Sequence, residues 1–172
     1  MPLGTDDKPV EPAYYHHDAT KGPPLDPPSC VLGIDPGLSG GLAVVGSDGF
    51  VECCKMPPTE KDVFTVIWGL TAGGRVSRAY IEKVHSMPHQ GVASMFTFGM
   101  NYGLLRGFLL ALEVPFEVVS PGVWQRAMGC LSKGNKNVTK ARAQELYPAL
   151  GKRITHATAD ALLIATYGLR QR

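Results

Sequence analysis

Three short apolar segments near the start of the chain limit its possible folds more than any other feature. They cover residues 31–36, 41–46 and 50–55, and stretches of a few residues rich in Gly or reading Ser-Asp-Gly join them. Connections this short cannot contain a crossover helix. The sequence therefore predicts three consecutive antiparallel strands.

After these strands the pattern alternates between helix and strand. We predict a helix, strand, helix and strand over 59–71, 78–84, 93–112 and 115–119, then three helices over 121–129, 138–147 and 155–170. Ser120 and Pro121 fit the cap and first turn of the first of these three. We expect an α/β fold of the ribonuclease H-like architecture: a mixed five-stranded sheet, three antiparallel strands then two parallel, flanked by helices.

Residues 1–29 differ in composition from the rest of the chain. They hold seven of the 14 prolines and show no apolar periodicity, so we expect a disordered tail before one folded domain over 30–172. Of the 17 basic and 15 acidic residues, the tail contains two and five, which leaves 15 and 10 on the domain. The resulting charge of +5 suits an anionic partner such as nucleic acid, although it is also ordinary for a soluble protein.

The apolar stretches and the cysteines indicate the compartment. No stretch reaches the roughly 18 apolar residues of a spanning helix, and the acidic start is unlike a signal peptide. We expect a cytoplasmic protein, from a bacterium or a phage-infected cell, with no membrane partner. The four cysteines lack C-x-x-C spacing, and we expect them to stay reduced, with the adjacent Cys53 and Cys54 on opposite faces of a strand.

Three glycines recur at every fourth position of the long predicted helix. Gly99, Gly103 and Gly107 therefore share one stripe, and each costs about 1 kcal/mol relative to alanine inside a helix. The stripe predicts that another backbone packs unusually close, and ordinary helix packing would suffice to explain it.

Three carboxylates interrupt segments that are otherwise apolar. Asp35 lies in the first predicted strand, Glu82 in the fourth and Asp160 in the last helix. Because a buried, unpaired carboxylate costs several kcal/mol, we expect the three to converge on a shared cation. Oxygen ligands without thiolates favour Mg²⁺ or Mn²⁺, and two such ions about 4 Å apart can hydrolyse a phosphodiester.

His156 stands four residues before Asp160 and shares its helical face. It could ligate a metal, position a water or carry a proton. By itself, a partly exposed histidine that pairs with a neighbour would explain it equally well, but a carboxylate on the same face favours the active site.

Four segments resemble the RuvC-like Holliday junction resolvases. These are "GIDPGLSGGLAVV", "YIEKV", "VSPGVWQRAMG" and "HATADALLIATYGL", and the likeness spans residues 31–170 and is closest to the phage and proteobacterial branch. The resemblance implies that Asp35, Glu82 and Asp160 are catalytic metal ligands. Bacterial members usually carry an acidic residue or histidine where Ala157 stands, whereas His156 is similar to the arrangement in plant chloroplast resolvases.

The resemblance also implies an activity and partners. Family members are Mg²⁺-dependent crossover junction endodeoxyribonucleases, in which Mn²⁺ can replace Mg²⁺ and two ions act per site. They are homodimers that bind four-way DNA junctions and make paired symmetric nicks with 5′-phosphate ends. The long helix with the glycine stripe is similar to the region through which family dimers pack.

Candidate DNA contacts lie in two segments outside the acidic centre. A basic segment offers Lys133, Lys140 and Arg142 for phosphates, and we assign Lys136 in the same segment to the solvated surface. The loop after the fourth strand holds His89 and Gln90, which could contact the junction or simply connect two elements. Trp124 and Phe96 could stack on bases, but their apolar surroundings favour a core position.

Three other functions fit part of the pattern. An actin-like or sugar-kinase ATPase begins with a similar strand and glycine-rich turn, but it needs two such domains and a much longer chain. A ribonuclease H-like nuclease acting on other branched DNA or on RNA–DNA hybrid would use the same carboxylates. A junction-binding protein without catalysis would not need all three of them.

Overall fold

A mixed five-stranded sheet forms the centre of the structure, a computed structural model that describes residues 29–84, 91–132 and 134–171. The strands are β1 (Cys30–Asp35), β2 (Gly41–Gly46), β3 (Val51–Lys55), β4 (Val76–Glu82) and β5 (Phe116–Val119). Their order is β3-β2-β1-β4-β5. β1 pairs antiparallel with β2, and β2 with β3, whereas β4 runs parallel to both β1 and β5. The predicted sheet is thereby confirmed.

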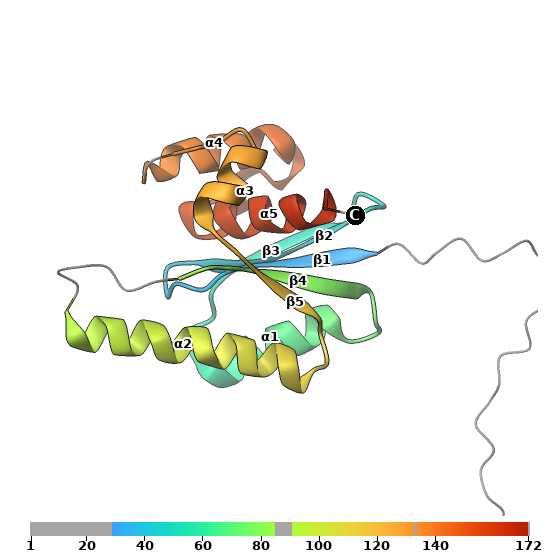
Figure 1. Cartoon of the computed structure of the whole chain (residues 1–172). Coiled ribbons are helices and arrows are strands. Elements are labelled where there is room, and N and C mark those ends of the chain that lie inside the picture. Colours follow the sequence, from blue (N-terminus) through green and yellow to red (C-terminus); the bar gives the residue numbers. More distant parts are fainter. Residues whose placement is uncertain (1–28, 85–90, 133, 172) are drawn as a thin grey trace, which may run out of the picture.

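Helices cover both faces of this sheet (Figure 1). α1 (Glu60–Thr71) and α2 (Val92–Ala111) lie on one face, and α3 (Pro121–Ala127), α4 (Lys136–Leu146) and α5 (His156–Leu169) lie on the other. A short 3₁₀ helix over Pro148–Arg153, which the sequence analysis did not predict, leads from α4 to α5. α4 begins at Lys136, two residues before its predicted start.

Alternation along the strands divides the buried side chains between two cores. Leu32 and Ile34 of β1 pack with α1 and α2, whereas Val31 packs with α5. Side chains an even number of residues apart on a strand point to the same face. Asp35 therefore shares a face with Val31, and Glu82 shares a face with Tyr80, which also packs with α5. Both carboxylates therefore belong to the α5 face. The same rule directs the side chains of Cys53 and Cys54 into opposite cores, as predicted. None of the four cysteines, all within the described residues, forms a disulfide.

α5 lies directly on the sheet because glycine leaves room for it. A β-carbon at Gly33 of β1 would collide with the backbone of Ala161 and Ala165 in α5. The helix starts with a capping box in which Thr155 and Thr158 exchange side-chain and backbone hydrogen bonds. This cap and the close contact fix where α5 begins and how it is rotated about its axis, and so they fix the position of Asp160, the residue directly before Ala161.

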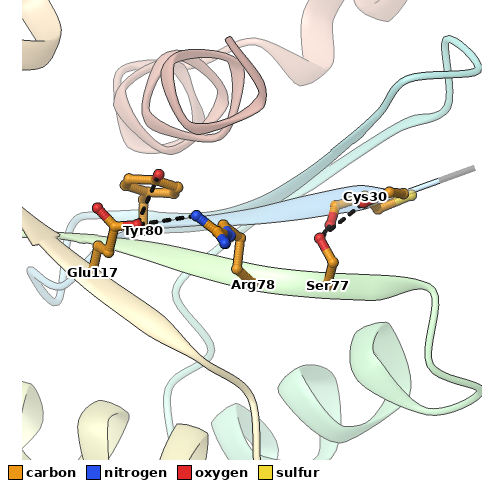
Figure 2. Close-up of polar contacts among 6 residues, drawn as sticks. Cys30, Ser77, Arg78, Tyr80 and Glu117 are labelled. Carbon is orange, nitrogen blue, oxygen red and sulfur yellow. Dashed lines mark hydrogen bonds and ion pairs between the residues drawn. The ribbon is translucent and has the colours of Figure 1, made fainter. Parts of the chain in front are cut away.

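Polar contacts hold the parallel strands β4 and β5 in register (Figure 2). The Tyr80 hydroxyl and the Arg78 guanidinium both donate to Glu117 Oε1, each at 3.1 Å. On the other side of β4, the Ser77 hydroxyl donates to the Cys30 carbonyl of β1 at 3.3 Å. These contacts join β1, β4 and β5, the strands whose carboxyl ends lie beside the acidic residues.

The long helix α2 differs from its sequence prediction in two respects. A β-carbon at Gly99, Gly103 or Gly107 would meet no atom within 4 Å, so no backbone of the described chain packs against the stripe. Phe96, expected in the core, is 69% exposed, because the buried residues of α2, Leu105 and Leu109, lie in its second half. Within the described residues, no helix combines the length and apolar character needed to span a membrane.

Candidate active site

The three carboxylates singled out in the sequence meet at one pocket on the α5 face of the sheet. Ile34 pairs with Ile81, so Asp35 and Glu82 occupy the next positions of two adjacent strands. Asp160 reaches the same place from α5, and all three line an open pocket of about 520 Å³. Strand adjacency thus brings Asp35 together with Glu82, 47 positions later in the sequence, and helix docking brings it together with Asp160, 125 positions later.

Asp35 ends β1 beneath a tight turn. It is only 9% exposed, and its Oδ1 accepts a long hydrogen bond of 3.4 Å from the backbone N–H of Gly37. A β-carbon at Gly40, where the turn returns to the sheet, would lie 2.7 Å from the Asp35 carboxyl carbon. Glycine at this position therefore lets the backbone close over the carboxylate.

Burial and mutual repulsion make the ionised carboxylates unfavourable in this pocket. Burial, followed by the nearby charge of Asp160, raises the pKa of Asp35 from 3.8 to about 6. Burial, followed by the charge of Asp35, raises the pKa of Glu82 from 4.5 to about 7. Burial likewise raises the pKa of Asp160. At neutral pH the three carboxylates together therefore favour the binding of a cation.

Asp160 carries a buried oxygen whose bonding capacity is not used within the described chain. Its Oδ1 has no hydrogen-bond partner among the described residues. A hydrogen bond from the Thr139 hydroxyl opposes the rise in the Asp160 pKa, but that hydroxyl also lies 3.2 Å from the Lys136 carbonyl oxygen. An unpaired buried carboxylate oxygen beside two other carboxylates is the arrangement that a bound cation would satisfy.

These side chains fit a magnesium-type ion. Among the residues that the structure describes, no three His, Cys, Asp or Glu side chains form a ready-made metal cage. Mg²⁺ does not need one, because it keeps several waters and uses one or two carboxylates together with substrate phosphates. The absence of cysteine or histidine from the pocket lining agrees with that preference for oxygen ligands.

Lys136 is the site residue that sequence reasoning missed. It is exposed, as predicted, but it lines the carboxylate pocket, and its charge lowers the pKa of Asp35, Glu82 and Asp160 alike. α4 begins at Lys136 with Asn135 as its cap, because the Asn135 side chain accepts from the backbone of Asn137. Lys136 lies in a polar stretch of the sequence, and nothing in that stretch indicates that it returns to the carboxylate pocket.

His156 lies near the carboxylates but outside the pocket lining. It is the first residue of α5, it is exposed, and its Nε2 lies 2.9 Å from Asn137 Oδ1. Its charge lowers the pKa of Asp160. The contact with Asn137 therefore holds His156 beside the pocket. This position is compatible with each of its three predicted roles, which are metal ligation, water positioning and proton transfer.

The candidate DNA-binding residues differ in how much of each side chain is available for contact with DNA. Arg142 donates from Nε to the Met128 carbonyl at 2.9 Å and pairs with Glu145 at 2.6 Å, so much of its guanidinium is occupied within the chain. Lys140 is partly buried on α4. Lys133, His89 and Gln90 lie outside the described residues, as do residues 1–28 of the tail predicted over 1–29.

Sheet order and helix placement define the class of fold, which is ribonuclease H-like. No protein-family model and no curated protein sequence matches the chain. Solved structures to which it is similar are RuvC Holliday junction resolvases, so the resemblance noted in the sequence is confirmed for the fold.

Three solved structures illustrate this similarity. Thermus thermophilus RuvC has a TM-score of 0.60 at 21% identity, and the same protein in complex with a Holliday junction substrate has 0.59 at 18%. Each alignment covers 83% of this chain and 96% of the RuvC chain. The yeast mitochondrial Holliday junction resolvase Ydc2 aligns over 84% of this chain and 80% of its own, at 16% identity and a TM-score of 0.46.

Proposed function

We propose that this chain is a divalent-metal-dependent endonuclease that resolves four-way DNA junctions by paired symmetric nicks with 5′-phosphate ends. The observation that carries the proposal is the convergence of Asp35, Glu82 and Asp160 on one open pocket beside Lys136. The RuvC fold supports it, since one of the similar structures is a RuvC bound to a Holliday junction substrate.

Residues in and around the pocket divide the tasks of this proposal among them. Asp35, Glu82 and Asp160 would hold one or two Mg²⁺ or Mn²⁺ ions, which activate water and stabilise the leaving oxygen when bound. Lys136 attracts the phosphate that enters an otherwise acidic pocket. Lys140 and the lysine at position 133 are candidates for flanking phosphates, and His156 orients water or supports the metal site.

We expect a four-way junction to be cut in preference to other nucleic acids. The purified chain is incubated with Mg²⁺ or Mn²⁺ and with end-labelled four-way junction, three-way junction, linear duplex or RNA–DNA hybrid. Two symmetric nicks that a ligase can reseal, found in the four-way junction alone, are the expected result. EDTA should abolish them, because the ions supply the reactive water.

The other outcomes of this assay separate the alternative functions. Cleavage mainly of hybrid would show a ribonuclease H-like nuclease directed at RNA, which the same carboxylates permit. Tight junction binding with no cleavage in either metal would show a junction-binding protein without catalysis. Either result would contradict the proposed resolvase activity.

We further propose that the chain acts as a homodimer through α2. Val92, Phe96 and Met100 are spaced four apart on this helix and are 80%, 69% and 48% exposed. The glycine stripe runs beside them with open space above each glycine. A contiguous apolar surface of this kind marks an interaction site, and a second copy could approach the glycines closely. Two sites could then cut two strands.

Phe96→Glu should convert the dimer into a monomer, because the change places a charge in the centre of an apolar interface. Sedimentation equilibrium of the full chain measures the outcome. Val138→Glu is the matched control, since Val138 is also exposed, at 38%, but lies on α4. A wild-type chain that sediments as a monomer at all concentrations would contradict dimer formation.

A further inference from the structure

Trp124 connects the hydrophobic core to the carboxylate pocket. It lies on the short helix α3, is fully buried and packs in the core beneath α5. Its indole Nε1–H donates a hydrogen bond of 2.7 Å to Glu82 Oε2. A buried tryptophan needs an acceptor for its N–H, but here the acceptor is a carboxylate that lines the candidate active site.

The hydrogen bond restricts the orientation of the Glu82 carboxylate. The last torsion of a glutamate side chain is broad and twofold, so a free carboxylate samples many orientations. The bond to Trp124 occupies Oε2, and the large indole that supplies it is held by packing on all sides. The remaining oxygen of Glu82 therefore has a defined direction at the pocket wall.

The residue after Trp124, Gln125, also lines this pocket and holds a second lining residue in place. Gln125 Oε1 accepts hydrogen bonds from the Ser132 backbone N–H at 3.2 Å and from the Ser132 hydroxyl at 3.4 Å. Gln125 and Ser132 both line the pocket, and the segment after Ser132 leads to Lys136. α3 thus holds Glu82 through one residue and the loop before Lys136 through the next.

We propose that Trp124 is a positioning residue for the divalent cation, which it serves by orienting Glu82 through its indole N–H. The inference rests on the metal site of the proposed function and extends it to a side chain that touches neither metal nor DNA. Groups that orient metal ligands in this way typically contribute about 10- to 100-fold to metal affinity.

Metal binding without DNA tests the proposal. Trp124→Phe keeps an aromatic ring but removes the N–H donor, and Trp68→Phe is the matched control, since Trp68 is 55% exposed on α1. Mn²⁺ binding to the metal-free chains is measured by electron paramagnetic resonance of the free ion. We expect Trp124→Phe to bind Mn²⁺ about 10-fold more weakly than wild type, with Trp68→Phe unchanged. Equal affinity in all three chains would overturn the proposal, as would a wild-type chain that binds no Mn²⁺.

A second measurement needs no core substitution. The chain contains two tryptophans, so ¹⁵N-labelled indole gives two N–H signals, and Trp68→Phe identifies the signal of Trp124 by elimination. Mg²⁺ should shift the Trp124 signal, because the cation draws charge from the carboxylate that accepts its hydrogen, and should leave the Trp68 signal in place. A Trp124 signal that stays fixed at saturating Mg²⁺ would overturn the proposal even if Trp124→Phe fails to fold. Neither measurement contains DNA, so a failure to cut junctions is a separate result.

Discussion

Asp35→Asn should abolish cleavage of a four-way junction and leave junction binding intact or tighter. Asparagine has nearly the shape of aspartate, so the turn over residue 35 can persist, but it lacks the charge that holds a cation. Loss of a metal ligand removes several kcal/mol of transition-state stabilisation, which corresponds to a rate reduction of about 1,000-fold or more. Binding should survive because Lys136 remains and one negative charge near the phosphates is gone.

Single-turnover cleavage and gel-shift titration in Ca²⁺ or EDTA measure the two effects separately. Asp48→Asn is the matched control, because it makes the same chemical change at a surface ion pair with Arg75, between β2 and β3. The control should cut at the wild-type rate. If Asp35→Asn lost binding together with cleavage, Asp35 would have a structural task and the proposed metal site would be wrong.

The metal-free protein should lose stability as the pH rises from about 4 to about 7. Folding raises the pKa of Asp35 from 3.8 to about 6 and that of Glu82 from 4.5 to about 7. Below their unfolded pKa values both groups are protonated in either state and cost nothing. Above their folded pKa values both must ionise inside the pocket, so the penalty for Asp35 is nearly complete at neutral pH, whereas that for Glu82 is complete only above its folded pKa of about 7. For Asp35 alone it is about 2 to 3 kcal/mol.

Chemical denaturation in EDTA at several pH values between 4 and 8 measures this loss of unfolding free energy. Saturating Mg²⁺ should restore stability at pH 8, because it binds the folded chain. Asp35→Asn should be more stable than wild type in EDTA at pH 8 and should gain less from Mg²⁺. A wild-type chain whose stability rises between pH 5 and pH 8 in EDTA would show that the carboxylates do not repel one another as proposed.

The sequence revealed those site residues whose burial conflicts with their charge. Asp35, Glu82 and Asp160 stand out because each interrupts an apolar segment. In the ribonuclease H-like sheet that the order of elements predicts, the first and fourth strands are neighbours, so Asp35 and Glu82 could be expected to lie side by side. Lys136 could not be found in this way, because lysine is common in exposed polar loops and its charge does not conflict with such a position. Its place at the pocket depends on where α4 begins, after a loop in which Gln125 accepts two hydrogen bonds from Ser132.

Two further residues show what helical periodicity leaves open. The apolar spacing of α2 gives a helix but not which part of it meets the sheet, so Phe96 was assigned to the core although it lies on an exposed turn. Trp124 was correctly assigned to the core, but no pattern in the sequence identifies Glu82 as the partner of its N–H. Both facts depend on contacts between segments that are distant along the chain.

The central position of α5 has a consequence for the newly made chain. This helix fills the core against β1 and β2 and also supplies Asp160, yet it follows every other helix and strand of the described residues. Its contacts with β1 span more than 100 residues of intervening chain, and such long-range contacts form late in folding. A nascent chain on the ribosome therefore cannot assemble the carboxylate pocket before α5 has been synthesised.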